Sequence, residues 1–424
     1  MRSRNRYAPS GTWGGRCDSN RSGHRHQSIP TTGMKVLHVI SALAPRSGGP
    51  TTVLKALTRQ QVQAGLDVTI CTTNLDHPQG TLDVTPNAPL LEDGVTIWYF
   101  SVDFPPLVIS RALWRWARQS LNKFDLVHIH GLYRFPPTYC ARLAWQRSIP
   151  YIIMPHGALD PYLYTKSSAS VCLKRLYERS LDLPNLHHAS AIHYTAEDER
   201  RLASFLDLRT PSFVLPNGID WGPFEHLPEP GAFRQATGVG AAPLVLFLGR
   251  LHQVKGLDIL VPAFDQVRRD LPQARLAIVG PANDGYADQV RDWTRARGLE
   301  QTVVFMEFLT GANLVQAYVD ADVFVLPSYT ESFGLTVVES MACELPVVIS
   351  QHVNIHHEVA AEGAGLVTAC DPDEVARAIL ELLNNPERRR RMGESGRRAA
   401  QRRYTWPRIV DLLTEEYRGV IERA

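Results

Sequence analysis

Short, almost continuously apolar segments alternate with stretches of helical spacing along most of this chain. Residues 35–40 (KVLHVI) form the first such segment, the loop 47–50 (SGGP) follows it, and residues 51–64 then carry apolar side chains at helical spacing. Strands that helices cover on both faces read as unbroken apolar runs, because neither face meets water. The alternation therefore predicts an α/β fold with doubly wound, parallel sheets.

The expected strands fall into two series of similar size. The first series comprises residues 35–40, 66–72, 95–100, 126–130, 151–155, 191–194 and 212–215, and the second comprises residues 244–248, 276–279, 303–305, 323–326, 346–349 and 365–367. We therefore expect two Rossmann-like domains, residues 34–215 and 216–405. Loops at the carboxyl ends of their strands would line a cleft between them.

Residues 1–33 differ from the rest of the chain. They contain six arginines against a single aspartate, many serines and glycines, and no apolar periodicity. Such a segment cannot bury enough surface to fold, so we expect a disordered basic tail. It lacks the apolar core of a secretory signal, and Met34 is a candidate for the native start. A basic arm that binds lipid is the alternative reading.

Composition excludes several classes of protein. The six cysteines form no CxxC pair and have no partner histidines at zinc spacing, so we expect free thiols in a reducing, cytoplasmic compartment. No apolar run approaches the roughly 20 residues of a membrane-spanning helix.

Residues 34–216 carry 18 Lys and Arg against 14 Asp and Glu, and this excess suggests either an anionic partner or chance variation among solvated faces. The basic residues form no folded recognition element, so we expect no nucleic-acid partner.

The loop 249–256 (GRLHQVKG) follows an expected strand of the second series. Arg250 and Lys255 lie five residues apart in it and could clamp adjacent phosphates, Arg250 as a planar fork and Lys255 as a point charge. The alternative is a pair of solvated charges.

The segment 331–339 (ESFGLTVVE) follows another strand of that series. Gly334 allows a tight turn into a helix beginning near Leu335, whose free N–H groups suit a pyrophosphate. Glu331 and Glu339 could accept hydrogen bonds from the vicinal hydroxyls of a sugar and a ribose. Either acid alone could equally be an ordinary partner of the helix dipole.

Two features of the first half point to the same cleft. Gly48 and Gly49 precede a helix whose N-terminus could bind an anion, although a structural turn is at least as plausible an interpretation. His130 and His156 end adjacent strands, and we expect both to point into the cleft. A structural role is the alternative for His130.

Four segments in order resemble the retaining glycosyltransferases of family 4, also called glycosyltransferase group 1: LPNGID, GRLHQVKG, ADVFVLPS and ESFGLTVVES, at residues 215–220, 249–256, 321–328 and 331–340. The SGGP loop and the segment HGALDP (156–161) agree with the same family. The resemblance covers nearly everything from Met34 onward. It implies the GT-B fold, with two Rossmann-like domains facing a central cleft.

The resemblance also implies roles for individual residues. Arg250 and Lys255 would bind the diphosphate of a nucleoside-diphosphate sugar, Glu331 would hold hydroxyls of its sugar, and Glu339 would bind the ribose. His156 would lie beside the anomeric carbon. The remaining expected donor contacts are Gly48 and Gly49 from the first domain and the backbone of Phe333, Gly334 and Leu335.

The family implies a retaining, metal-independent transfer of a hexose, without a cofactor, to a hydroxyl group of a saccharide or lipid-linked saccharide, in cell-surface polysaccharide biosynthesis. A helix at residues 406–424 is expected to pack back onto the first domain. The helical segment 110–121 interleaves Arg111, Arg115 and Arg118 with tryptophans, which suits peripheral contact with the anionic inner face of the cytoplasmic membrane, or else packing on the sheet with solvated arginines. A nucleotide-sugar 2-epimerase and a non-catalytic nucleotide-sugar-binding or scaffold protein are the alternative functions.

Two features need comment beside the family pattern. Glu307 precedes Phe308 where a glycine is often found, which puts contacts with the base at that loop in doubt. Asp320 and Asp322 match a metal-binding DxD only superficially, because they approach a buried strand. We interpret them as structural.

Overall fold

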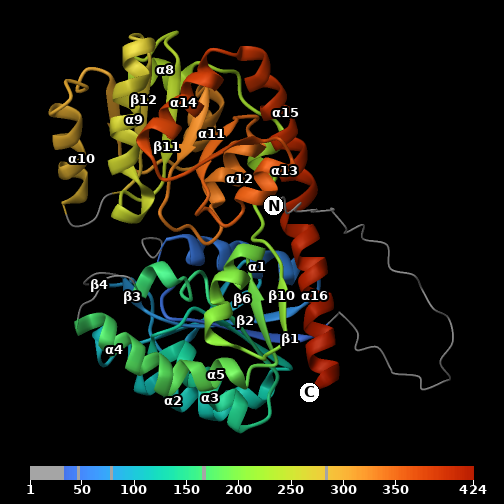
Figure 1. Cartoon of the computed structure of the whole chain (residues 1–424). Helices are drawn as coiled ribbons and strands as arrows, with labels where there is room; N and C mark the ends of the chain where they lie inside the picture. Colours follow the sequence, from blue (N-terminus) through green and yellow to red (C-terminus); the bar gives the residue numbers. More distant parts are fainter. Residues whose placement is uncertain (1–32, 45–47, 77–79, 165–168, 282–284) are drawn as a thin grey trace, which may run out of the picture.

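The structure is a computed structural model that describes residues 33–44, 48–76, 80–164, 169–281 and 285–424. The expected disordered tail, apart from Gly33, lies outside these residues. The described chain forms two α/β halves, and the last helix runs down one side of the first half (Figure 1). The predicted α/β fold with two doubly wound sheets is confirmed.

The first half is built on an eight-stranded sheet of order β10-β9-β8-β7-β1-β2-β6-β5. Its strands are β1 (Lys35–Ile40), β2 (Asp67–Thr73), β5 (Pro89–Glu92), β6 (Val95–Phe100), β7 (Leu126–His130), β8 (Tyr151–Met154), β9 (Ala191–Tyr194) and β10 (Ser212–Val214). Its helices are α1 (Gly49–Gln63), η2 (Pro105–Leu107), α2 (Arg111–Ser120), η3 (Leu121–Lys123), α3 (Phe135–Gln146), η4 (Pro161–Tyr164), α4 (Ala169–Tyr177), η5 (Glu178–Asp182), α5 (Leu183–His187), α6 (Glu197–Leu202) and η6 (Ala203–Leu206).

Strand β5 departs from the parallel pattern and was not predicted. It pairs antiparallel with β6 at the edge of the sheet, and all four of its residues are exposed. An exposed edge strand lacks the continuous apolar run by which buried strands are recognised. A further short antiparallel pair, β3 (Leu75–Asp76) and β4 (Gly80–Thr81), lies outside the main sheet.

The second half contains a six-stranded, fully parallel sheet of order β13-β12-β11-β14-β15-β16. Its strands are β11 (Leu244–Leu248), β12 (Arg275–Val279), β13 (Val303–Met306), β14 (Val323–Leu326), β15 (Val347–Ser350) and β16 (Gly365–Thr368). Its helices are α7 (Gly222–Glu225), α8 (Ala232–Thr237), η7 (Gln253–Lys255), α9 (Leu257–Asp270), α10 (Tyr286–Arg295), α11 (Gly311–Asp320), α12 (Leu335–Ala342), α13 (His356–Ala361), α14 (Pro372–Leu383) and α15 (Pro386–Arg403).

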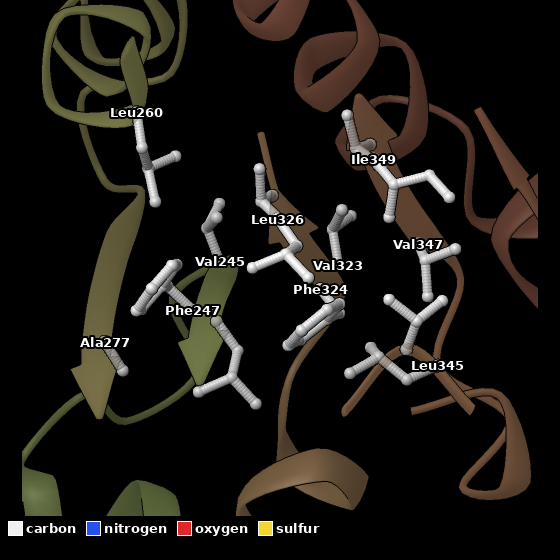
Figure 2. Close-up of a cluster of buried hydrophobic side chains, with 14 of the residues drawn as sticks. Val245, Phe247, Leu260, Ala277, Val323, Phe324, Leu326, Leu345, Val347 and Ile349 are labelled. Carbon is white, nitrogen blue, oxygen red and sulfur yellow. The ribbon is translucent and has the colours of Figure 1, made fainter. Parts of the chain in front are cut away.

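The core of the second half shows why its strands are recognisable in the sequence. Phe247, Phe324 and Ile349 lie on neighbouring strands and are fully buried together with the residues around them (Figure 2). Helices cover both faces of this sheet, so consecutive residues of one strand are all apolar. This packing holds the loops at the carboxyl ends of the strands in place.

The last helix, α16 (Trp406–Arg423), belongs by contact to the first half (Figure 1). Its buried face, which includes Ile409, Leu413 and Tyr417, packs in one cluster with Leu54 of α1 and Val36 of β1. The chain therefore returns to the first sheet after completing the second. Among the described residues, no helix combines the length and apolar composition needed to cross a bilayer.

Candidate active site

A cavity of about 520 Å³ opens between the two halves. Residues of the first half on its wall include Thr52, Lys55 and Arg59, and residues of the second half include Phe308, Leu335 and Glu339. Of the predicted site residues, Leu335 and Glu339 line this cavity. Arg59 also donates to Asp220 at 2.9 Å, and this ion pair, formed by two residues of the cavity wall, joins the two halves.

The loop after β11 carries the two predicted cations. The Lys255 ammonium group contacts the Glu331 carboxylate, and both side chains are mostly buried. Arg250 is exposed, and its guanidinium has no hydrogen-bond or ion-pair partner within the described part of the chain. One cation therefore orients a predicted sugar-binding carboxylate, while the other is available to an anionic ligand.

Gly256 ends this loop, and its conformation explains the requirement for glycine. Its φ is +71°, and a Cβ at this position would lie 2.0 Å from the backbone oxygen of Pro327. The loop after β11 is thus pressed against the end of β14, which leads into the Glu331 loop. Any larger residue would separate the two loops, and with them Lys255 and Glu331.

Helix α12 begins directly after Gly334, which adopts φ +85° as its N-cap. No acidic side chain occupies its first turn, so its first N–H groups are open to an anion. Glu339, one turn further on, accepts a hydrogen bond of 2.7 Å from the Tyr318 hydroxyl. Burial raises the pKa of the Glu339 carboxyl to about 7, against the opposing effect of the Tyr318 hydrogen bond.

Helix α1 offers a similar N-terminus from the first half. It begins at Gly49 after the N-cap Gly48, whose φ is +87°, and its first turn contains no acid. No described atom outside the adjoining residues lies within 4 Å of where a Cβ at either glycine would be. The two predicted glycines therefore leave their backbone accessible, as an approach to phosphate would require.

His156 lies in the loop after β8, at φ +53°. The next residue, Gly157, adopts φ +76°, and a Cβ there would lie 2.6 Å from the Cβ of Ser332. Ser332 follows Glu331 in the chain. The loop carrying His156 and the loop carrying Glu331 therefore touch across the boundary between the halves.

Two further contacts join these two loops, and a third joins the Glu331 loop to Thr195, which directly follows β9. Thr195 donates a hydrogen bond of 3.0 Å to the backbone oxygen of Ser332, and the Thr330 hydroxyl contacts the Asp160 carboxylate. The rings of Tyr162 and Tyr329 lie nearly parallel, with centroids 6.1 Å apart. These contacts fix how the loop that carries His156 meets the second half.

Glu199 holds the His156 loop through hydrogen bonds, and the sequence analysis did not identify it as a site residue. Its buried carboxylate accepts hydrogen bonds from the Gly157 N–H at 2.6 Å and from both the N–H and the hydroxyl of Thr195 at 2.7 Å. Burial raises the pKa of this carboxyl, and the three hydrogen bonds oppose the rise. The only sequence signal was an acid on a short helix directly after a strand, which is too common to single out.

Other predicted residues take different positions. Phe333 is buried and packs edge-on against Tyr404, so its side chain belongs to the core. His130 is buried rather than exposed to the cleft, and its Nδ1 lies 3.1 Å from Nε2 of His156. The expectation that both histidines face the cleft is therefore wrong for His130, because it lies on β7 and not in the following loop.

The DxD-like pair is structural, as interpreted from the sequence. The Asp320 carboxylate accepts from three backbone N–H groups at 2.5–3.0 Å, those of Gly231, Phe233 and Arg234. Asp322 accepts from the Arg234 guanidinium at 2.9 Å and from a backbone N–H at 2.8 Å. Both acids thus anchor the helix before β11.

Helix α2 exposes its arginines, as the segment 110–121 suggested. Arg111, Arg115 and Arg118 are exposed, and Arg118 stacks over the ring of Trp114, which is 40% exposed. Trp116 instead packs against Trp98 and Phe100 in the core. The helix therefore presents a basic surface with one aromatic side chain.

Two family profiles match consecutive parts of the chain. "Glycosyl transferase 4-like domain" matches residues 48–218, and "Glycosyl transferases group 1" matches residues 232–399. The first match covers the strands of the first sheet except β1, and the second covers all six strands of the second sheet.

Curated relatives resemble about half of the chain. A D-inositol 3-phosphate glycosyltransferase of Kineococcus radiotolerans is 34% identical over 226 residues, which are 49% of this chain and 52% of that protein. A GDP-mannose-dependent alpha-(1-6)-phosphatidylinositol monomannoside mannosyltransferase of Mycolicibacterium smegmatis is 32% identical over 213 residues, 47% of this chain and 55% of that protein. The chain thus spans about half the length of these curated relatives.

Similarity of fold extends further. A sucrose-phosphate synthase from Thermosynechococcus elongatus superposes with a TM-score of 0.74 at 22% identity, covering 92% of this chain and 100% of that one. At this identity the likeness establishes the arrangement of the two domains and not a shared substrate.

Proposed function

Because the chain belongs to the group 1 glycosyltransferases and has their GT-B fold, we propose that it transfers a hexose from a nucleoside-diphosphate sugar to a hydroxyl group of a saccharide or lipid-linked saccharide. The observation that carries this proposal is the contact between Lys255 and Glu331, which faces the His156 loop across the domain boundary. The site thus brings together a cation, a carboxylate that can bind hydroxyl groups and an imidazole, which suits such a transfer.

The second domain, residues 216–405, binds the donor in this proposal. Glu339 on the cavity wall accepts hydrogen bonds from the ribose, and the exposed ring of Phe308 on the same wall offers a face to the base. The diphosphate lies at the N-terminus of α12, between Arg250 and Lys255. Gly48 and Gly49 approach it from the first domain.

The chemistry is a front-face substitution with retention and without a metal ion. The bond between the anomeric carbon and the diphosphate oxygen breaks, and the acceptor oxygen forms its bond on the same face. The acceptor's proton passes to the departing phosphate oxygen. Arg250, Lys255 and the α12 dipole stabilise the negative charge that develops there, an effect typically worth about 3–4 kcal/mol per well-placed donor. His156 positions the sugar.

The first domain, residues 34–215, receives the acceptor in this proposal. The relative from Mycolicibacterium smegmatis is named for a lipid acceptor, which supports a lipid-linked saccharide here. The exposed arginines and Trp114 of α2 would then meet anionic headgroups at the inner face of the cytoplasmic membrane. Cell-surface polysaccharide biosynthesis is the proposed context.

The proposed donor is tested by thermal shift with UDP-, GDP- and ADP-sugars, followed by donor hydrolysis with each compound that stabilises the protein. A ligand at about a hundred times its dissociation constant adds roughly 2.7 kcal/mol to the free energy of unfolding. Lys255→Ala should lower turnover by orders of magnitude. Stabilisation by no nucleotide sugar, in folded protein, would overturn the proposal.

Metal independence, retention of configuration and membrane contact are tested separately. Turnover unchanged by EDTA supports metal independence, and retention is read from the anomeric proton coupling of the first product by NMR. Membrane contact is tested by flotation with vesicles of anionic phospholipid, using wild type and a variant with Ala at Arg111, Arg115 and Arg118. Equal flotation of the two proteins, or none by either, would count against the α2 surface.

A further inference from the structure

Several buried positions on one face of the first sheet are occupied by histidines, where apolar residues would be expected. His38 on β1 and His128 and His130 on β7 lie on the face that α1 and α16 cover, and each is at most 1% exposed. His193 on β9 is 3% exposed, and its ring centroid lies 5.5 Å from that of His128. Neighbouring positions on this face are Val36, Ile40 and Leu126, so the histidines are exceptions in an otherwise apolar layer.

Hydrogen bonds join two of these histidines, His130 and His38, to His156 in a chain that starts at the candidate active site. Nε2 of His156 lies 3.1 Å from Nδ1 of His130, and Nε2 of His130 lies 2.9 Å from Nδ1 of His38. Nε2 of His38 lies 2.8 Å from Oε1 of Gln61 on α1. The Gln61 amide nitrogen donates to the Tyr417 hydroxyl on α16 at 3.2 Å, and this hydroxyl in turn lies 2.7 Å from Nδ1 of His128.

All three imidazoles are neutral at physiological pH. Burial lowers the pKa of His156 to about 3 and that of His38 to about 4, in the latter case against the opposing hydrogen bond to Gln61. Burial and the neighbouring histidines lower the pKa of His130 as well. A neutral imidazole has one N–H donor and one acceptor nitrogen, so such a chain must run head to tail.

The Gln61 carboxamide determines the direction of the chain. Its Oε1 can only accept, so His38 carries its proton on Nε2 and accepts at Nδ1. His130 then donates from Nε2 and accepts at Nδ1, and His156 donates from Nε2. Nδ1 of His156, which has no protein partner among the described residues, is left as an acceptor.

We propose that Gln61 and the buried chain through His38 and His130 fix His156 as its Nε2–H tautomer, so that its Nδ1 accepts a hydrogen bond from a hydroxyl group of the donor sugar. This inference rests on the proposed function for the sugar, but the tautomer itself is a property of the free protein. His38, His130 and Gln61 are positioning residues that act through His156. Tyr417 holds the Gln61 amide and links the site to the last helix.

The tautomer is read directly from ring ¹⁵N NMR of histidine-labelled full-length protein, with the His156 signals assigned by their loss in His156→Gln. The expected spectrum has a protonated Nε2 and an unprotonated Nδ1 at His156. The reverse assignment would mean that the Gln61 amide is rotated by half a turn and would overturn the proposal.

A matched pair of variants tests the role of Gln61. Gln61→Glu keeps an acceptor for His38 and should retain the wild-type tautomer, whereas Gln61→Leu has similar size without an acceptor and should give a mixture. Tyr417→Phe is a milder second variant, expected to shift the tautomer in the same direction as Gln61→Leu. His193→Phe is the control, because His193 donates to the backbone oxygen of Leu215 at 2.8 Å and is no link in the chain.

Donor hydrolysis supplies the second readout, with the nucleotide sugar that stabilises the protein. Gln61→Leu should lower kcat about tenfold and change KM less than twofold, since a displaced catalytic group affects the reacting geometry more than binding. Gln61→Glu and His193→Phe should stay within threefold of wild type. An equal loss of kcat in all three variants would mean that these residues only pack in the core, and would refute the positioning role.

The outcomes separate this inference from the proposed function. An Nε2–H tautomer that Gln61→Leu abolishes upholds the chain even if no donor is turned over. His38, His128 and His130 could also hold a metal ion by their spacing. Stoichiometric zinc in the purified protein, measured by elemental analysis, would replace the hydrogen bond between His38 and His130 and overturn the proposal.

Discussion

The Lys255 ammonium group contacts the Glu331 carboxylate although 76 residues separate them in the sequence. Lys255 follows β11 and Glu331 follows β14, and these two strands are neighbours in the second sheet. Parallel strands end at the same edge, so their loops meet there. A bound nucleotide sugar would place a phosphate at Lys255 and hydroxyl groups at Glu331.

Arg250 provides the cleanest test of charge stabilisation, because it is exposed and has no protein partner in the described chain. Arg250→Ala should lower kcat about a hundredfold through loss of a charge near the departing diphosphate. Its Tm should remain that of wild type. Lys123→Ala removes another exposed cation, in the first domain, and serves as control; a comparable loss of kcat in that variant would refute a local effect.

Glu339 should make nucleotide binding depend on pH. Its carboxyl pKa is raised to about 7, so the group is largely protonated below that pH and accepts poorly from ribose hydroxyls. Affinity for the nucleoside diphosphate of the stabilising donor should therefore increase as the pH rises through about 7. Calorimetric titration at several pH values measures this. The ligand's own ionisation also makes its affinity depend on pH, and this part should remain in Glu339→Gln. The additional pH dependence of affinity that wild type shows should be absent from the variant.

The same shift predicts an effect on stability with the opposite sign. A carboxyl group whose pKa is higher in the folded state than in the unfolded state favours folding at low pH, and this contribution is lost as the pH rises toward the folded pKa. Between about pH 4.5 and 7, unliganded wild type should lose more stability than Glu339→Gln. Chemical denaturation across this range decides the point, and parallel curves would contradict it.

Gly157 should be indispensable for domain contact. An alanine Cβ there would meet Ser332 at 2.6 Å, and φ +76° adds strain of roughly 1–2 kcal/mol for a residue with a side chain. Gly157→Ala should therefore lower both Tm and kcat. Adding Ser332→Gly removes the clash but not the strain, so the double variant should recover part of kcat, with Ser332→Gly alone as control. No recovery would show that the clash is unimportant.

Glu199 should affect turnover without touching substrate. Glu199→Gln places an amide donor against one of the N–H groups that Glu199 now accepts, and a buried donor left unpaired costs about 1–3 kcal/mol. We expect a lower Tm, and a kcat reduced about tenfold with little change in KM because the His156 loop shifts. Glu197→Gln on the same helix removes only an exposed ion pair and should behave as wild type.

Much of the architecture could be read from the sequence for a physical reason. Strands such as Leu244–Leu248 and Val323–Leu326 are buried on both faces, and continuous apolar runs mark them almost to the residue. Edge strand β5 escaped prediction because its exposed residues carry no such run. The motif loops were also recognisable, since Gly256 and Gly334 adopt backbone conformations that favour glycine.

Contacts between distant segments were decided only by the tertiary structure. Glu199 meets Gly157 because β8 and β9 are adjacent, and Gln61 meets Tyr417 because α16 returns to α1 across 356 residues. In a strand, a buried histidine occupies the same kind of position as a buried apolar residue. The hydrogen-bonded series from His156 to Gln61 therefore could not be recognised from the spacing of residues in the sequence. The sequence by itself determined which segments are strands and which loops carry charge. The packing of the two sheets and the last helix determined which of those groups support one another, because hydrogen bonds depend on positions in space and not on spacing along the chain.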